Sequence, residues 1–455
     1  MAMTDKIKNS KENYLLVYPK QVSEDIGRAV NTMGFIDKKL PDENLDSIES
    51  KLSEVNQELD SLENEIENFK KNNEETFESL PSTVEYYEKS EDIISKMAKG
   101  EKYLYLTGWV PNSKVKEFEN LSKKYDKTNV EVKKKYNQEP PTKLRNNKLF
   151  RPFEFLVNMY GAPNYNEIDP TPFFAVSYML LYGMMFGDLG QGLVFVLLSF
   201  LVDKKDKTFG ALIRRVGFSA CFFGLMYGSV FGIETLIPAI LIKPFDNIMK
   251  VLIASVAFGI GLLVIAYCMG IYNKLVKQNN IEEGIFGKEG IAGLMMMISF
   301  VLIILNIVKV NPMPISVGFA LLIASIVMIV FSKPIAAKIE KRDEIFESSA
   351  FDYYVESSFS IIEALLSVFS NLVSFTRVGA FAINHVGLYM AFEVMSKIAG
   401  GGIKGLIILI LGNILIIGLE GMIVFIQGLR LEFYEMFSKY YQGNGRKFRP
   451  VKERK

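Results

Sequence analysis

The sequence predicts a mainly α-helical protein in two parts: a cytosolic α/β head with a coiled-coil hairpin, and a polytopic membrane domain of eight helical spans, the last two long and tilted. Three observations predict this fold. Residues 1–165 are rich in Lys, Glu, Asp and Asn, a heptad repeat runs through residues 45–69, and apolar runs of 18 residues or more recur after Pro172. Runs of that length can cross the apolar core of a bilayer, about 30 Å thick.

Residues 1–165 are predicted to form the arm. A strand-like segment at 14–19 leads into a helical pattern that ends near Met33, and a strand, helix, strand unit from Tyr103 completes a small α/β head. Between them the apolar residues alternate in steps of three and four: Leu45, Ile48, Leu52, Val55, Leu59, Leu62, Ile66 and Phe69. A second helix from about Val84 to Met97 can run back against this seam, which gives a coiled-coil hairpin over residues 42–98.

Two functions are open for the arm, an ordinary regulatory domain or a lever that docks on another subunit, and we favour the lever. The arm contains no glycine-rich phosphate loop and no metal-ligand cluster, so any ATP is expected to bind another chain, and no cofactor is expected on this one. Cys221 and Cys268 lie in apolar segments and are expected to be buried. Lys plus Arg (52) and Asp plus Glu (51) nearly cancel, and no nucleic-acid partner is expected.

Residues 166–455 are predicted to form the transmembrane domain. Seven apolar segments are visible, but the first, from Pro172 to Val202, carries "GDLGQG" at its centre, where three glycines and Asp188 disfavour a continuous helix. Splitting it gives eight spans. The basic loops near Lys204, Lys274 and Lys338 and the basic C-terminal tail then share one side of the membrane, as the positive-inside rule requires. We therefore expect a multi-pass protein of the cell membrane with both termini in the cytosol.

Two polar stripes run along the last two long helices. The first comprises Glu363, Ser370, Ser374, Arg377 and Asn384, spaced by 7, 4, 3 and 7 residues, and the second comprises Asn413, Glu420, Gln427 and Arg430. Each set falls on nearly one helix face. The helices are expected to run antiparallel around the "GGG" turn at 400–402, so Arg377 and Arg430 lie at comparable depth.

A charge inside a membrane is costly, by about 2.5 to 3.5 kcal/mol on insertion scales, so these arginines need a partner or a wet cavity. One interpretation is that they only neutralise Glu363 and Glu420 within a bundle. The other, which the two parallel stripes favour, is a polar path that reaches part-way into the membrane. His385 is the only histidine; it can be a hydrogen-bonded structural group or a proton relay beside such a path.

The segment "SFTRVGAFAINH" resembles the arginine-bearing helix of the membrane subunit of vacuolar/archaeal-type rotary ATPases, called subunit a or subunit I. Three further segments share the resemblance in the same order: "EPPTKLRNNKLFRPFEFLVNMYGAPNYNEIDPTPFF", "MMFGDLGQG" and "GLEGMIVFIQGLRLEFYEMFSKYYQGNG". Together they extend over about 300 residues. The resemblance implies a non-catalytic subunit with eight membrane helices that forms an ion path beside a rotating ring of c subunits.

Matching positions give the site residues. Arg377 corresponds to the family's essential ring-facing arginine and Arg430 to its second arginine, and the resemblance implies that Glu363, Glu420 and His385 line the polar channel. Ser374, Asn384 and Gln427 are further candidates for ion translocation, and Asp188 is a candidate for a secondary or structural polar site. The implied partners are the c-ring, the peripheral stalk through the arm, the central-stalk socket subunit and the lipid bilayer.

The arm departs from the family pattern, because the sequence supplies residues for one lobe where the family usually has two joined by a long coiled coil. A different class also fits intramembrane arginines and carboxylates, namely a secondary ion transporter. No internal repeat pairs the first four spans with the last four, which favours the rotary subunit. Neither the ion, H⁺ or Na⁺, nor the direction, ATP synthesis or hydrolysis, follows from this chain.

Overall fold

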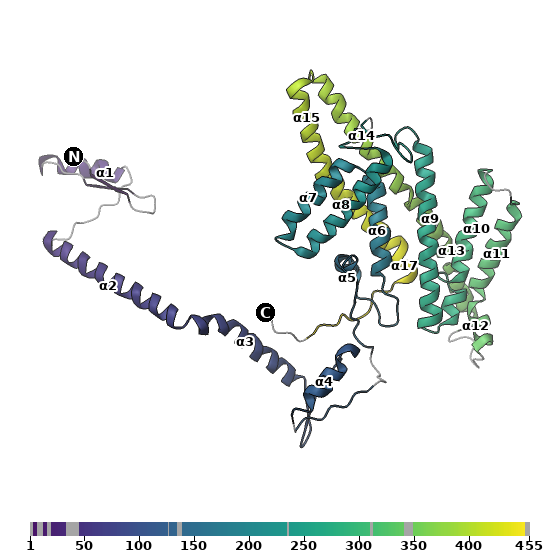
Figure 1. The fold of residues 1–455 in the computed structure, drawn as a ribbon, viewed down its shortest axis with the longest axis horizontal. Helices are drawn as coiled ribbons and strands as arrows, with labels where there is room; N and C mark the ends of the chain where they lie inside the picture. Colours follow the sequence, from purple (N-terminus) through teal and green to yellow (C-terminus); the bar gives the residue numbers. More distant parts are fainter. Residues whose placement is uncertain are drawn as a thin grey trace. The chain divides into compact units, whose positions relative to one another are not determined.

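The computed structural model describes residues 3–6, 12–15, 20–32, 45–125, 127–133, 139–233, 236–309, 313–340 and 349–450. The chain is mainly helical and divides into two compact units, Met1–Leu106 and Thr107–Pro450 (Figure 1). Parts of the predicted arm, at 16–19, 33–44 and 134–138, lie outside the described residues.

The first unit begins with a two-stranded antiparallel sheet. Strand β1 (Met3–Lys6) pairs with β2 (Glu12–Leu15), and the short helix η1 (Lys20–Val22) leads into α1 (Ser23–Thr32). Glu24 and Asp25 occupy the first turn of α1, where carboxylates interact favourably with the helix dipole. A second antiparallel pair, β3 (Ala98–Lys99) with β4 (Leu104–Tyr105), lies near the end of the unit.

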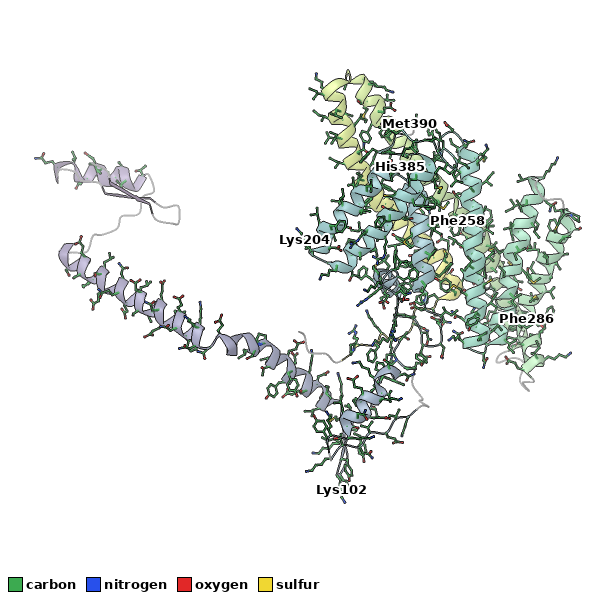
Figure 2. All side chains as sticks on the ribbon, viewed as in Figure 1. Lys102, Lys204, Phe258, Phe286, His385 and Met390 are labelled. Carbon is green, nitrogen blue, oxygen red and sulfur yellow. The ribbon has the colours of Figure 1, made fainter. Side chains whose placement is uncertain are left out.

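Two long helices join these sheets. Helix α2 (Leu45–Asn72) is followed by α3 (Glu74–Ser95) with only Asn73 between them, and the two lie end to end in Figure 1. The turn predicted near residues 70–83 is therefore helical, and Pro81 lies inside α3. Seam residues Leu59 and Ile66 remain more than half exposed, and in Figure 2 the α2 side chains project without a neighbouring helix. The described residues of α2 and α3 therefore do not show the predicted hairpin, and the coiled coil stays a prediction.

The strand, helix, strand unit predicted from Tyr103 is present only in part. After β4 the structure has the short helix η2 (Asn112–Lys114) and α4 (Val115–Ser122), whereas residues 127–133 form no regular element. The α/β head is thus not confirmed by the described residues.

Residues 139–170 of the second unit pack on its helices. The one-turn helix η3 (Arg151–Phe153) continues into α5 (Glu154–Tyr160), and the fully buried Phe153 ring contacts the rings of Phe174 and Tyr178 at centroid distances of 6.4 and 6.2 Å. Thr142 forms a backbone bridge with Lys447. The change of composition near residue 165 therefore does not coincide with a change in packing.

The apolar helices follow in the order α6 (Thr171–Phe186), α7 (Leu189–Asp203), α8 (Lys207–Tyr227), α9 (Ile248–Tyr272), α10 (Ile291–Ile307), α11 (Ile315–Val330), α12 (Ser332–Glu340), α13 (Ala350–Ser374), α14 (Thr376–Ile398), α15 (Gly402–Leu415), α16 (Gly421–Arg430) and α17 (Phe437–Tyr440). In the described part of the chain, four π-helical turns extend them: η4 (Asn273–Lys277), η5 (Glu282–Phe286), η6 (Ile416–Glu420) and η7 (Leu431–Met436).

Among the described residues, five helical stretches are long and apolar enough to cross a membrane: Lys207–Tyr227, Ile248–Lys277, Glu282–Ile307, Ala350–Ile398 and Gly402–Tyr440. A sixth results if α11 and α12, bent by 66° against each other, count as one span. Helices α6 and α7 are apolar but shorter. They are separated at Gly187 and Asp188, where the sequence predicts the break.

Aromatic side chains fill the core between α6 and the C-terminal helices. The Phe174 ring stacks on Tyr178 with centroids 5.6 Å apart and contacts Phe437 at 5.4 Å. Burying rings of this size supplies much of the packing energy of a core. Cys221 is buried in this unit as expected, but Cys268 on α9 is exposed, so the expectation was wrong for Cys268.

The helices that carry the two polar stripes form the longest candidate membrane stretches among the described residues, 49 and 39 residues. Helices α13 and α14 are interrupted only at Phe375, whose side chain is fully buried. Its ring lies against Gly259 of α9 so closely that a β-carbon at residue 259 would collide with it. The predicted "GGG" turn is present: Gly400, Gly401 and Gly402 all have positive φ, a conformation that glycine adopts without strain.

Candidate functional site

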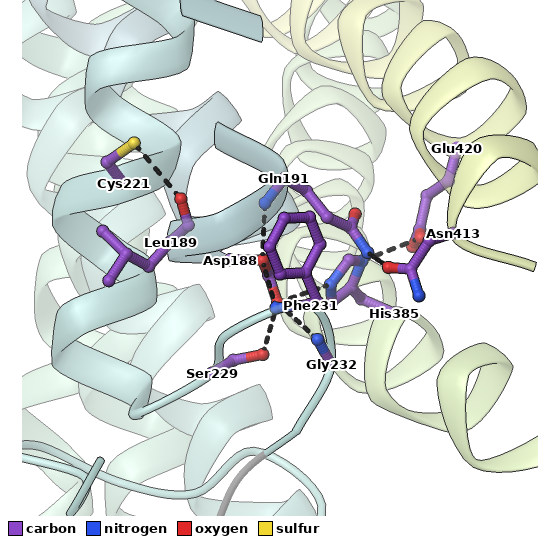
Figure 3. Close-up of polar contacts among 10 residues, drawn as sticks. All are labelled: Asp188, Leu189, Gln191, Cys221, Ser229, Phe231, Gly232, His385, Asn413 and Glu420. Atoms are coloured by element: carbon purple, nitrogen blue, oxygen red, sulfur yellow. Dashed lines mark hydrogen bonds and ion pairs between the residues drawn. The ribbon is translucent and has the colours of Figure 1, made fainter. Parts of the chain in front are cut away.

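Asp188 is the anchor of a buried polar cluster (Figure 3). It lies at the N-cap of α7, and its Oδ1 accepts a hydrogen bond from the backbone N–H of Gln191 at 2.8 Å. The loop after α8 supplies three more donors: the N–H of Phe231 at 2.9 Å, the N–H of Gly232 at 2.7 Å and the Ser229 hydroxyl at 2.6 Å. Four donors satisfy the carboxylate, so the ionised form is well stabilised even without water.

His385 of α14 connects this carboxylate to a second one. Its Nδ1 lies 2.8 Å from Glu420 Oε2 on η6, and its Nε2 lies 3.8 Å from Asp188 Oδ2. All three side chains are at most 3% exposed. The Phe186 ring lies beside the imidazole, at a centroid distance of 5.0 Å. In Figure 2 His385 lies inside the helical bundle, whereas Lys204 lies at its edge.

The geometry limits what this cluster can do. A protonated imidazole can donate to both carboxylates, whereas a neutral ring can serve only one of them at a time. Glu420 Oε1 has no hydrogen-bond partner among the described residues, so it can gain or lose a proton without breaking a hydrogen bond. His385 Nε2 also has no hydrogen-bond partner there, and its ion-pair contact with Asp188 Oδ2, at 3.8 Å, exists only while the ring is protonated. Gln191 Nε2 donates to Asn413 Oδ1 at 2.9 Å and extends the polar region towards α15. The cluster can therefore hold a proton in transit, and the predicted roles of His385, as a structural link and as a relay, are both compatible with it.

The arginines lie in a second, more open place. Arg377 is in the first turn of α14 and is half-buried, and Arg430 ends α16 and is exposed. Both lie near enough to Glu435 of η7 to interact with its charge. One guanidinium nitrogen of Arg377, Nη1, is buried and finds no acceptor in the described part of the chain.

The structure rejects one of the two interpretations from the sequence. Glu420 is occupied by His385, and Glu363, which is exposed, forms an ion pair with Lys288 at 2.7 Å. The two carboxylates therefore do not neutralise Arg377 and Arg430, because Glu420 pairs with His385 and Glu363 pairs with Lys288. The two stripes are consequently not equivalent: one carboxylate is inside the bundle and the other is on its surface.

The remaining candidates are distributed along the same helices. Ser374 is half-buried against Glu435, Asn384 is exposed, and Gln427 is half-buried with an unpartnered Oε1 among the described residues. Within the described ranges, no three side chains of metal-binding type come together.

In the C-terminal helices, the sequence patterns missed three buried charged residues: Glu432, Glu435 and Lys439. The stripe through Arg430 continues in regular α-helical spacing to Tyr434, which is 72% exposed. The π-helical turn η7 winds the chain more slowly, so Glu435 is the residue that faces inward. The only sequence signal was the presence of charges in an otherwise apolar run.

The fold and this site define a class: helical proteins with several helices of membrane-spanning length and composition and with ionisable groups enclosed among them. The profile of the V-type ATPase 116kDa subunit family matches residues 4–235, just over half of the chain. The chain belongs to this family.

Relatives match over most of the chain. It is 27% identical to the A-type ATP synthase subunit I of Saccharolobus solfataricus over 79% of this chain and 62% of that protein. It is 26% identical to the protein of the same name from Methanocaldococcus jannaschii, over 90% and 64%, and 27% identical to that of Archaeoglobus fulgidus, over 97% and 73%. The chain thus spans slightly less than two thirds of the first two relatives.

Proposed function

We propose that the protein is the membrane stator subunit of a V/A-type rotary ATPase, with two ion half-channels that lie beside a ring of c subunits. The observation that carries the proposal is the incomplete arginine face: Arg377 has a buried nitrogen without an acceptor in the described chain, and Arg430 is exposed on an apolar helix. Glu435, whose charge both arginines share, can balance only one of them, and the remaining positive charge at membrane depth implies a partner outside this chain. Membership of the family and the names of the relatives support a rotary complex.

The proposed membrane topology has eight spans. It counts the five long helices, the bent pair α11 and α12, and the two shorter helices α6 and α7, separated at Asp188. Basic residues near Lys204, Lys274 and Lys338 and the C-terminal tail then lie on the cytosolic side, together with both termini. The arm would contact the peripheral stalk, and the central-stalk socket subunit would complete the complex.

The proposed mechanism is electrostatic. An ion enters one half-channel, binds a carboxylate of the ring and leaves through the other half-channel after the ring has turned. Arg377 separates the two, because a cation that does not deprotonate lowers the affinity of the passing carboxylate for H⁺ or Na⁺. It also repels cations that would otherwise leak straight across.

The buried cluster fits one of the half-channels. An ionised Asp188, an imidazole and Glu420 form a short series of groups that can exchange protons, and Gln427 and Asn384 extend polar surface along the same helices. Glu363 and Ser374 would line the other access route, on the face that carries Arg377.

The test is ATP-driven ion pumping by the reconstituted complex that carries Arg377→Ala, with ATP hydrolysis and copurification of the other subunits followed in parallel. Pumping should fall to background while the complex stays assembled, and Arg377→Lys should retain a part of it. Lys397→Ala is the matched control, since Lys397 is an exposed cation at the end of the same helix that pairs with Glu393 at 2.7 Å. Normal pumping by Arg377→Ala would reject the proposal.

A further inference from the structure

A cavity of about 380 Å³ opens at the end of α9, away from the arginines and from the Asp188 cluster. Its lining comes from four places: the end of α9 with η4, the loop between η5 and α10, the loop before α6, and the C-terminal segment after η7. The lining residues used below are Glu167, Asn273, Lys274, Glu289, Lys439 and Asn444. Apolar sequence ends at Tyr272 and the first lysines follow directly, so the cavity lies at the depth where lipid headgroups meet a membrane protein.

Lys439 brings an uncompensated positive charge to this cavity. The residue is 5% exposed, its Nζ donates to Ser367 Oγ at 3.1 Å, and the ammonium lies 5.5 Å from the centroid of the Tyr267 ring. An ammonium has three donors. Within the described chain Lys439 forms no ion pair, so its contacts leave both its charge and part of its donor capacity for a ligand.

Glu167 brings an uncompensated negative charge from a different segment. It is 9% exposed; its Oε2 accepts a long hydrogen bond, 3.4 Å, from the N–H of Asn164, and its Oε1 is buried without a hydrogen-bond partner among the described residues. Desolvation raises the pKa of this carboxyl, against the hydrogen bonds from the backbone at Asn164 and Gln442. A cation placed at Oε1 would compensate the ionised form.

The other two charges of the lining neutralise each other, since Lys274 Nζ lies 3.1 Å from Glu289 Oε2. What remains is one ammonium and one carboxylate without an ion-pair partner among the described residues, in a cavity lined by two positive and two negative side chains. A simple anion would meet Glu167, and a simple cation would meet Lys439. A ligand that carries both signs, a few bonds apart, satisfies both residues.

We propose that this cavity binds the headgroup of a phospholipid with a primary amine, its phosphate beside Lys439 and its ammonium beside Glu167. The volume falls in the range of small-ligand sites, about 300 to 1,000 Å³. Amide side chains of Asn273 and Asn444 supply neutral polar surface between the two charged residues. Such a lipid joins the C-terminal segment to α9 at the membrane surface, a role separate from ion transport.

The experiment measures lipid retained by the intact complex. The complex is purified in detergent, delipidated and exposed to nanodiscs of phosphatidylethanolamine, phosphatidylglycerol or phosphatidylcholine, and bound lipid per chain is counted by native mass spectrometry. One phosphatidylethanolamine per chain should be retained, about tenfold more than phosphatidylcholine, whose headgroup carries no N–H donor. Lys439→Gln should lose this binding, and Lys397→Gln, an exposed control, should not.

Two further arms separate the alternatives. Glu167→Gln should abolish the preference for phosphatidylethanolamine over phosphatidylcholine while some phosphate-dependent binding persists. Inorganic phosphate, added at millimolar concentration, should not displace the lipid; displacement would identify a free-phosphate site and overturn the lipid proposal. Equal retention by the wild-type complex and Lys439→Gln would also overturn it. If Lys439→Gln does not assemble, the headgroup preference of the wild-type complex alone decides, since equal binding of the three lipids rejects the proposal.

Discussion

The buried cluster around His385 and the open face around Arg377 both hold ionisable side chains of the same two long helical stretches, but only the cluster has its charges paired within the described chain. Asp188 accepts four hydrogen bonds and Glu420 meets the imidazole inside the chain itself. Arg377 keeps a buried nitrogen without an acceptor in the described chain, and Arg430 is exposed. We call the first set closed, because its charges find their partners when the chain folds. We call the second set open, because we expect its charges to find partners only when the complex assembles.

This difference predicts that substitutions in the two regions affect different measured quantities, protein stability in one and ion transport in the other. Substitutions in the closed cluster should lower the free energy of unfolding, because they leave a buried charge without its partner. Substitutions on the open face should leave the fold unchanged and act on transport. The measurements below test this contrast on the free energy of unfolding of the detergent-solubilised protein, from the largest expected change to the smallest.

The largest change is expected for His385→Ala. It leaves Glu420 buried without its partner and two carboxylates facing each other, and removing one member of a buried charged pair typically costs about 3–5 kcal/mol. Chemical unfolding measures it. His385→Gln, which keeps an N–H donor towards Glu420, should recover part of the loss. A stability equal to the wild type would mean that the cluster is not closed.

Asp188→Ala should cost at least about 1.5–3 kcal/mol, the range for a single hydrogen bond to a charged group, since four donors lose their acceptor. A matched control is Asp206→Ala. Asp206 caps α8 in the same manner, accepting from Thr208 and Phe209, but in an exposed place, where loss of a cap costs about 0.5–2 kcal/mol. An equal cost at the two positions would contradict the importance of burial.

Glu363→Gln should change stability by at most about 1 kcal/mol, because its pair with Lys288 is exposed and screened. If Glu363 lines an access route, pumping slows without stopping. Raising the ionic strength should reduce the difference in stability between variant and wild type, whereas a large, salt-independent loss would show that this carboxylate belongs to the closed set.

The smallest stability change is expected for Arg430→Ala, within about 0.5 kcal/mol, as for surface substitutions in general. Its effect should appear in pumping by the assembled complex instead. A substantial loss of stability in the isolated chain would show that Arg430 is already satisfied internally, and the contrast between the two regions would fail.

The sequence predicted the helices and turns that carry the two sets of charges better than it predicted which side chains pair with each other. The break at Asp188, the glycine turn at 400–402 and the two long helices follow from composition and periodicity, because glycines and apolar runs act locally. Burial of Glu420 by His385, 35 residues earlier, depends on how α14 packs against η6, which no local pattern contains.

Two features of the structure were not predicted from the sequence, and each has a physical reason. A constant helical period cannot include π-helical turns, so Glu435 and Lys439 fell outside the stripes. In the arm, turn-forming residues near Asn73 predicted a reversal, but helix propensity continues on both sides and the chain stays helical through Pro81. The heptad spacing of residues 45–69 predicts that α2 has an apolar face. It does not predict which helix packs against that face.

The contact between Phe375 and Gly259 restricts which amino acids position 259 can accept. Phe375 forms the joint between α13 and α14, two residues before Arg377, and only a residue without a side chain leaves room for its ring on α9. A methyl group at position 259 would displace the joint and move the arginine relative to the rest of the bundle. A mutational scan would therefore find an intolerant position on a helix that carries none of the proposed ion-path residues.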